Sequence, residues 1–165
     1  MNRIKSIGAL ILVMAVMSFA TACSKPKYND GVSCESLASA ATEQMPGELD
    51  FRELEASFRD FYFGETNGFD DCYVAYSAEA EDISEIGVFH SESDEDADGI
   101  ERACLEYITD LQQNSRAFIE SYAPNELSKL DSAEVRRYGR YVVYTVLDGE
   151  DAERVFESVR GLLEQ

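Results

Sequence analysis

Basic residues are scarce in this chain of 165 residues. Asp and Glu number 33 against 14 Lys and Arg, which gives a formal net charge of −19. Nucleic-acid binding relies on clustered Lys and Arg, so this composition argues against DNA or RNA as a partner. The hydrophobic share of 45% is nevertheless high enough for a sizeable core, and the length suits a single domain.

The sequence also lacks the motifs of several catalytic and metal-binding classes. His90 is the only histidine, and no Ser or Cys nucleophile motif accompanies it, so a hydrolase triad has no visible basis. Cys-x-x-Cys spacing and glycine-rich phosphate loops are both absent. Carboxylates are so numerous that no pair of them stands out as a glycosidase acid and base. We therefore expect a non-catalytic protein without a cofactor.

No hydrophobic run is long enough to span a bilayer. Residues 7–19 are uncharged and mostly apolar, but these 13 residues fall short of the roughly 20 that a spanning helix needs. Because Arg3 and Lys5 precede it, this run is typical of the core of a signal peptide. Residues 1–22 are therefore predicted to be a leader that is removed on export.

The end of this leader, Ala-Thr-Ala-Cys at residues 20–23, has two interpretations. Ala-x-Ala suits an ordinary signal peptidase, which would release a secreted protein. Small residues before a Cys also resemble a bacterial lipobox, although Ala20 stands where lipoboxes usually carry Leu. We favour the lipobox: Cys23 is acylated, palmitate-like chains hold the protein on the outer face of the cell membrane, and residues 23–32 form a polar tether.

The remaining cysteines leave the disulfide pattern open. If Cys23 is acylated, then Cys34, Cys72 and Cys104 allow one disulfide and one free thiol, or no disulfide at all. Cys34 and Cys104 fall on the apolar faces of predicted helices. That position favours buried, unpaired thiols that act as small hydrophobic residues.

Hydrophobic periodicity predicts a single α+β domain over residues 33–165. Two short helices are expected first, at 34–45 and from Asp50 to about residue 64, followed by two longer helices and four strands. The longer helices are expected at 94–122 and 150–163, and the strands at 72–77, 83–91, 133–138 and 140–147.

The order of strand, strand, acidic turn and helix occurs twice. Two such ββα units predict a four-stranded antiparallel sheet with both long helices on one face. The short N-terminal helices would then cover an edge or part of the other face. Residues 141–147 are apolar at both alternating positions, which fits a central strand that is covered on both sides.

Several segments resemble a known family. They are residues 82–89 (Asp-Ile-Ser-Glu-Ile-Gly-Val-Phe), the long helix that follows, Tyr122-Ala-Pro124, and residues 139–144 (Gly-Arg-Tyr-Val-Val-Tyr) with their acidic-led helix. This pattern is similar to a family of small extracytoplasmic lipoproteins of Gram-positive anaerobes that carry a domain of unknown function. The resemblance covers roughly residues 33–163. It supports the fold and the location, and it implies no activity, substrate or catalytic residue.

Asp94, Asp96 and Asp98 form the sharpest local pattern. With the glycine that follows, they reproduce the first half of a calcium-binding loop. Such a loop then needs a bidentate acid at the position of Leu105, and Glu106 comes one place too late. A solvated helix start explains the same acids, because the first turn of a helix favours negative charge. A calcium-responsive domain is therefore the alternative function.

Two further groups are candidate contact surfaces. Arg136, Arg137 and Arg140 form the only basic cluster of the predicted domain, and they could hold an anionic ligand or an acidic partner. Tyr73, Tyr76, Tyr141 and Tyr144 could present aromatic rings to sugars or peptides, and the sheet near Tyr73 and Tyr141 is the expected contact surface. Charge neutralisation is the favoured explanation of the arginines, and core packing with cross-strand pairing is the favoured explanation of the tyrosines.

The function expected from the sequence is therefore a membrane-anchored binding or accessory module of unknown specific activity. Its expected partners are the membrane, through the lipid anchor, and an unknown extracytoplasmic protein or glycan. An unrecognised hydrolase is the less favoured alternative, and it would need polar residues that converge in a pocket of the fold.

Overall fold

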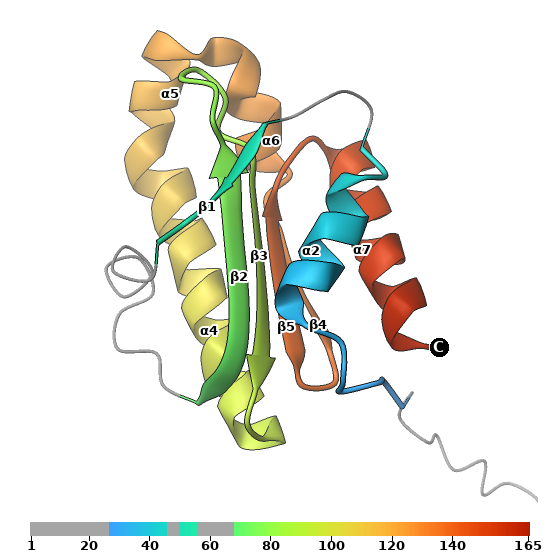
Figure 1. Cartoon of the computed structure of the whole chain (residues 1–165). Coiled ribbons are helices and arrows are strands. Elements are labelled where there is room, and N and C mark those ends of the chain that lie inside the picture. The colour runs from blue at the N-terminus through green and yellow to red at the C-terminus, as the bar shows by residue number, and fades with distance from the viewer. Residues whose placement is uncertain (1–26, 46–49, 56–67) are drawn as a thin grey trace, which may run out of the picture.

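A computed structural model describes residues 27–45, 50–55 and 68–165 of the chain (Figure 1). The predicted leader and the candidate acylation site Cys23 lie outside these residues. No helix in the described ranges has the length and apolar character needed to cross a membrane.

An antiparallel sheet of five strands lies at the centre of the fold, in the order β1-β2-β3-β5-β4 (Figure 1). The four strands expected from the sequence are all present, and β3 and β5 occupy the middle. The strands are β1 Phe51–Glu53, β2 Phe69–Ser77, β3 Glu85–Ser91, β4 Glu134–Tyr138 and β5 Tyr141–Val146.

Strand β1 corrects the expectation of a four-stranded sheet. The sequence predicts that a helix begins at Asp50, but Phe51 pairs with Ser77 of β2 and the next two residues continue the ladder. A strand of three residues is too short to show an alternating pattern, and pairing with a distant strand overrides the local preference. Most of the expected helix falls within residues 56–67, outside the described ranges.

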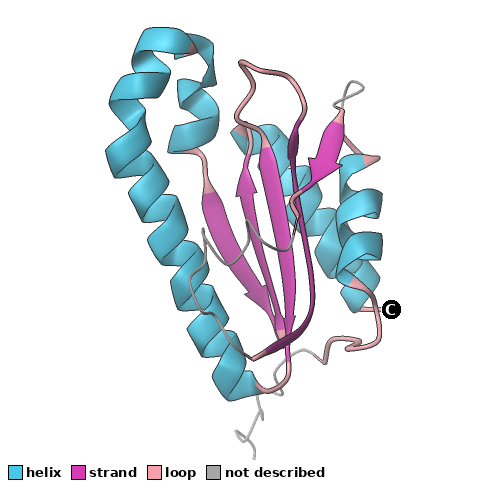
Figure 2. Ribbon diagram, turned by 60° about the vertical axis from the view of Figure 1, so that its left-hand side comes forward, coloured by secondary structure: helices cyan, strands magenta, loops and turns pink. Residues whose placement is uncertain are grey.

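Helices cover both faces of the sheet, so the two long helices do not share one face as expected. α7 (Gly149–Leu163) and α2 (Cys34–Thr42) pack together on one side, and α4 (Asp94–Asp110) covers the other (Figures 1 and 2). The reason lies in the central strands. Val88 belongs to the core beneath α2 and α7, and its neighbour Phe89 belongs to the core beneath α4. Each face therefore needs its own cover to exclude water.

The predicted helix at 94–122 contains a π-helical turn. α4 is followed by η1 (Leu111–Ser115) and then by α5 (Arg116–Tyr122). The apolar period of the sequence is interrupted at the same place, around Asn114. π-helical turns are rare and are frequent near functional sites. After α5, η2 (Pro124–Glu126) and α6 (Leu127–Asp131) lead back to the sheet.

Residues 28–32, expected to belong to the polar tether, pack against the domain. The ring of Tyr28 meets that of Tyr138 edge to face, with centroids 5.8 Å apart. The hydroxyl of Tyr141 donates to the carbonyl oxygen of Val32 at 2.7 Å. These contacts fix the segment beside the turn between β4 and β5.

No disulfide joins Cys34, Cys72 and Cys104 to one another. Cys34 is buried beneath α2, whereas Cys104 is buried beneath α4 on the opposite side of the sheet. Burial raises the pKa of both thiols, and nearby acids add to the effect. Of the alternatives left open by the sequence, the structure therefore shows the one without a disulfide among these three.

A substitution at Gly87 tests how closely β3 and β5 pack at this position. Gly87 lies opposite Tyr144, and a Cβ at this position would overlap the tyrosine ring. Gly87→Ala should therefore lower the free energy of unfolding by about 1–3 kcal/mol, the usual cost of overpacking. Gly99→Ala is the matched control, because its Cβ would meet no atom within 4 Å and Ala favours a helix. Urea denaturation measures both variants, and equal stabilities would contradict the packing described.

Candidate functional site: a pocket beside a buried carboxyl group

A pocket of about 530 Å³ opens between β2, the connection to β3, and the C-terminal end of α4. Its volume lies within the range of about 300–1,000 Å³ that is typical of small-molecule sites. The described residues that line it combine apolar side chains, two tyrosines, three serines and two acids. They are Leu54, Val74, Tyr76, Ser77, Asp82, Ile83, Ser84, Glu85, Tyr107, Leu111 and Ser115.

Glu85 is the partly buried acid of this pocket. It is the first residue of β3, the middle strand, and pairs with Val146, the last residue of β5, so it lies at one end of the sheet. The hydroxyl of Tyr107, from α4, donates to Glu85 Oε2 at 2.8 Å. The hydroxyl of Tyr144, from β5, donates to Oε1. Three separate elements therefore hold one carboxyl group in a single orientation.

Burial raises the pKa of Glu85 above its ordinary value, and the two tyrosine hydrogen bonds oppose this shift without cancelling it. Burial also raises the pKa of Tyr144, and the neighbouring Glu85 raises it further. Shifted pKa values at the edge of a cavity are typical of functional sites, although structural networks produce them too. The ionisation of the Glu85 carboxyl group should therefore depend on any charge that enters the pocket.

A second charged cluster holds the rim of the pocket in place. Lys129 of α6 lies 2.6 Å from Asp82 and 2.7 Å from Glu126. The backbone N–H of Ser84 donates to Asp82 at 2.8 Å. Partial burial raises the pKa of Asp82, but hydrogen bonds from Lys129 and Ser84 outweigh it and lower the pKa. The connection from β2 to β3 is thereby tied to α6.

The π-helical turn forms another part of the rim. Leu111 and Ser115, at its two ends, both line the pocket. The side-chain amide of Gln112 donates to the carbonyl oxygen of Leu130 at 3.0 Å, which ties the turn to α6. The π-helical turn therefore forms part of the wall of the pocket.

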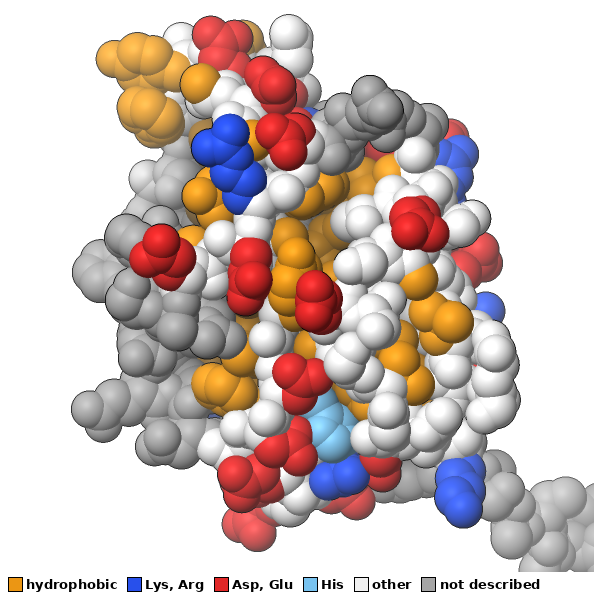
Figure 3. All heavy atoms as spheres, viewed as in Figure 1, with side chains coloured by type: hydrophobic (Ala, Val, Ile, Leu, Met, Phe, Trp, Pro, Cys, Tyr) orange, Lys and Arg blue, Asp and Glu red, His pale blue; other side chains and the backbone are white. Residues whose placement is uncertain are grey.

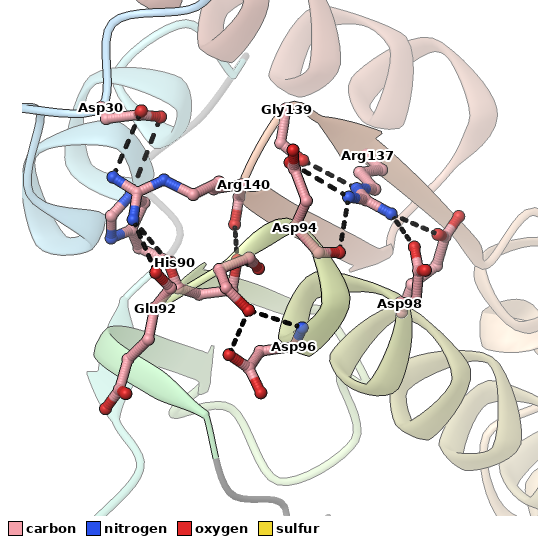
Figure 4. A network of polar contacts seen from close by, with 12 residues as sticks. Asp30, His90, Glu92, Asp94, Asp96, Asp98, Arg137, Gly139 and Arg140 are labelled. Carbon is pink, nitrogen blue, oxygen red and sulfur yellow. Dashed lines mark hydrogen bonds and ion pairs between the residues drawn. The ribbon is translucent and has the colours of Figure 1, made fainter.

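The three arginines expected as a contact surface bind groups of the domain itself. Arg136 contacts Glu134 and Glu153 and lies over a phenylalanine ring. Arg137 binds Asp98 and the backbone carbonyl of Asp94. Arg140 binds Asp30 and two backbone carbonyl oxygens (Figure 4). Each guanidinium therefore neutralises nearby acids or caps carbonyl groups, and the three do not converge on a common cavity.

The acids of the candidate calcium loop lie at the start of α4 and face different partners. Asp94 and Asp98 approach Arg137, whereas Asp96 exchanges hydrogen bonds with the helix cap Ser93 (Figure 4). Among the described residues, no three His, Cys, Asp or Glu side chains are grouped to hold a metal ion. The three acids therefore lie in the first turns of α4, where Asp94 and Asp98 pair with Arg137 and Asp96 with Ser93.

The two candidate tyrosines differ in exposure. Tyr141 is completely buried between the sheet and α2, so it lies in the core and not on a contact surface. Its place on a central strand, with both faces covered, explains this burial. Tyr73 is half-buried beside the same core.

His90 is buried against Tyr141 and lies beside acids and Arg140 (Figures 3 and 4). Its Nδ1 lies 2.5 Å from Asp70, as in the histidine–acid pair of a hydrolase. Its buried Nε2 has no hydrogen-bond partner among the described residues, and Asp30 lies 3.8 Å away. The nucleophile that would complete a triad is therefore not aligned with His90 in the described part of the chain.

Sequence reasoning did not single out Glu85 and Tyr107, and it considered Tyr144 only as an aromatic contact residue of the sheet. One signal was available: Glu85 falls on the same alternating positions of β3 as Phe89, which face a buried layer. An acid at such a position is unusual and is normally paired. Among 33 acids, this signal becomes visible only once the bounds and orientation of β3 are known.

A family model described as a domain of unknown function (DUF4358) matches residues 51–147. The match contains all five strands of the sheet, α4, the π-helical turn and every pocket-lining residue named above. Comparison with the curated proteins and with the solved structures finds no match.

Glu85→Gln tests the buried carboxyl group. Because the pKa of Glu85 is raised in the folded state, its ionisation destabilises the fold as the pH rises through that pKa. We expect the stability of the wild type, relative to Glu85→Gln, to fall as the pH rises from the ordinary pKa of glutamate, about 4, towards the raised pKa of the folded state. Tyr107→Phe removes a bond that favours the ionised form, so it should extend the fall to higher pH and make the total loss of stability larger. Urea denaturation across this range measures the difference. A flat or rising difference would contradict the raised pKa.

Proposed function

The chain belongs to the family of the domain of unknown function DUF4358, and we propose that it is a lipid-anchored extracytoplasmic protein that binds a small ligand beside Glu85 without catalysing a reaction. The observation that carries the proposal is a pocket of about 530 Å³ with an oriented, buried carboxyl group at its wall. The volume of the pocket suits a small molecule. The expected protein or glycan partner would therefore supply this ligand and would not itself fill the pocket.

The chemistry of the pocket favours binding over catalysis. Acid–base hydrolysis of a glycoside needs two carboxyl groups that both act on the substrate. Glu85 and Asp82 are the acids among the described lining residues, and Lys129 already holds Asp82. Glu85 itself is oriented by two hydroxyl groups, which is typical of a group that recognises a ligand. A fixed polar group within an apolar wall supplies orientation and specificity.

The membrane anchor is proposed from residues 1–23, and the fold adds a geometric consequence. Residues 28–32 pack beside the turn between β4 and β5. Residues 24–27 can span at most about 14 Å, because an extended chain rises about 3.5 Å per residue. An acylated Cys23 would therefore keep this end of the domain close to the membrane, although anionic lipids would repel so acidic a body.

The pocket would then face away from the membrane. β3 and β5 are antiparallel, with His90 opposite Tyr141 beside the β4–β5 turn. Glu85 lies at the other end of the same ladder, opposite Val146. A ligand outside the cell could therefore reach the pocket without crossing the lipid surface.

Cys23→Ser tests the anchor. Without the thiol no acyl chain can be attached, so most of the protein should move from the membrane fraction to the medium. Cys72→Ser is the matched control, because it removes another thiol and should leave the protein in the membrane fraction. Intact mass of the wild type extracted from membranes should include the added acyl chains. Wild-type protein recovered from the medium with an unmodified Cys23 would contradict the anchor.

Ser115→Trp tests the pocket. An indole at this position would fill part of the cavity, so binding of the neutral fluorescent probe N-phenyl-1-naphthylamine should weaken about tenfold or more, equivalent to at least about 1.4 kcal/mol. Asn114→Trp, at the exposed neighbouring position, is the matched control and should bind as the wild type does. The mature chain with Cys23→Ser allows titration without detergent. Failure of the wild type to bind, or undiminished binding by Ser115→Trp, would contradict the proposed pocket.

A further inference from the structure

The side chains around the pocket favour one charge on its ligand. We propose that the pocket selects a small organic cation, an ammonium group attached to an apolar portion, with Glu85 as the counter-ion. This inference rests on the proposed binding function and names the chemical class of the ligand. It follows from the charges in the pocket, from the bonding of Glu85 and from the side chains around it.

Positive charge is missing from the described lining of the pocket. Those residues include two acids and neither Lys nor Arg. Lys129, behind Asp82, is engaged by Asp82 and Glu126 and is only about 15% exposed. An anionic ligand would therefore meet acids without a cation to bind it. The whole chain also carries a net charge of −19, and acids are spread over the face shown in Figure 3, which attracts cations from solution.

Glu85 can accept further hydrogen bonds. An ionised carboxylate offers about four acceptor positions, and Tyr107 and Tyr144 occupy one on each oxygen. The remaining positions suit the N–H donors of an ammonium group, which form strong charge-assisted bonds with a carboxylate. Because the tyrosines already hold the carboxyl group in place, a ligand would not have to order it.

An entering cation would also relieve the cost of burying the charge. Burial raises the pKa of Glu85 in the empty pocket. A positive charge beside a carboxyl group favours the ionised form and lowers its pKa. Binding of a cation is therefore coupled to loss of a proton from Glu85. The affinity for a cation should rise with pH through the range in which Glu85 ionises.

The other lining residues favour an organic cation over a metal ion. Tyr76 and Tyr107 bring aromatic rings to the pocket, and ammonium groups bind the faces of such rings. Leu54, Val74 and Ile83 add apolar surface that a hydrocarbon portion would cover. A metal ion usually takes several charged or imidazole ligands, and no three His, Cys, Asp or Glu side chains of the described residues are grouped to supply them.

Three probes of one skeleton test the inference: phenethylammonium, 2-phenylethanol and phenylacetate. They are of similar size and carry a positive charge, no charge and a negative charge. Isothermal titration at neutral pH, with the mature chain carrying Cys23→Ser, measures each affinity. We expect phenethylammonium to bind at least tenfold more tightly than 2-phenylethanol, and phenylacetate to bind most weakly.

Variants separate the role of Glu85 from the general acidity of the chain. Glu85→Gln should weaken phenethylammonium binding about tenfold or more and leave 2-phenylethanol unchanged. Glu106→Gln is the matched control: it removes the same formal charge from the exposed side of α4 and should change the affinity less than twofold. The affinity of the wild type for phenethylammonium should rise with pH, and this dependence should be absent from Glu85→Gln.

Two results would overturn the inference. If 2-phenylethanol binds as tightly as phenethylammonium, the pocket binds ligands without selecting a cation, and the proposed function stands. If none of the three probes binds while N-phenyl-1-naphthylamine does, cation selection is likewise rejected. Failure of all four probes rejects the pocket itself. The probe series uses the unaltered pocket, so it decides the question even if Glu85→Gln does not fold.

Discussion

Burial of both faces of β3 and β5 is the constraint on which the rest of the fold depends. Successive residues of these strands, such as Val88 and Phe89, enter two different cores. Each core requires a helical cover, and this requirement places α4 on one side and the pair of α2 and α7 on the other (Figure 2). At the end of β3 the same constraint buries a carboxyl group. Glu85 falls where an apolar residue would be expected, and two tyrosine hydroxyl groups compensate for its burial.

The pocket lies where this layered packing ends. After α4 the chain continues as a π-helical turn. The connection from β2 to β3 is bound to α6 through the ion pair of Asp82 with Lys129. The space between these two rims leaves one side of Glu85 accessible to the pocket. The basic cluster at the start of α4, by contrast, is paired with acids of the domain, as Arg137 and Asp98 show. Recognition is therefore proposed for the pocket and not for the charged surface.

Much of the fold follows from the sequence alone. Alternation and period place four strands and two long helices, and the doubly apolar residues 141–147 identify the central strand. The faces covered by the helices do not follow, because a ββα unit has the same local pattern whichever face its helix covers. β1 is too short for a pattern of its own. The site is harder still: Glu85 and Tyr107 are ordinary residues until the fold brings them together, and the partners of Arg137 depend on the packing of α4 against β4.

The central claim is that Glu85, a partly buried carboxyl group with a raised pKa, is the counter-ion of a cation bound in the pocket. Carboxyl ¹³C NMR of the glutamate-labelled mature chain tests this most directly, with Glu85→Gln used to assign the resonance. The account predicts a carboxyl signal that titrates at higher pH than that of an ordinary glutamate, and that moves to the ionised position when phenethylammonium is added. A Glu85 signal that titrates at the ordinary pH of a glutamate and does not respond to the cation would contradict it.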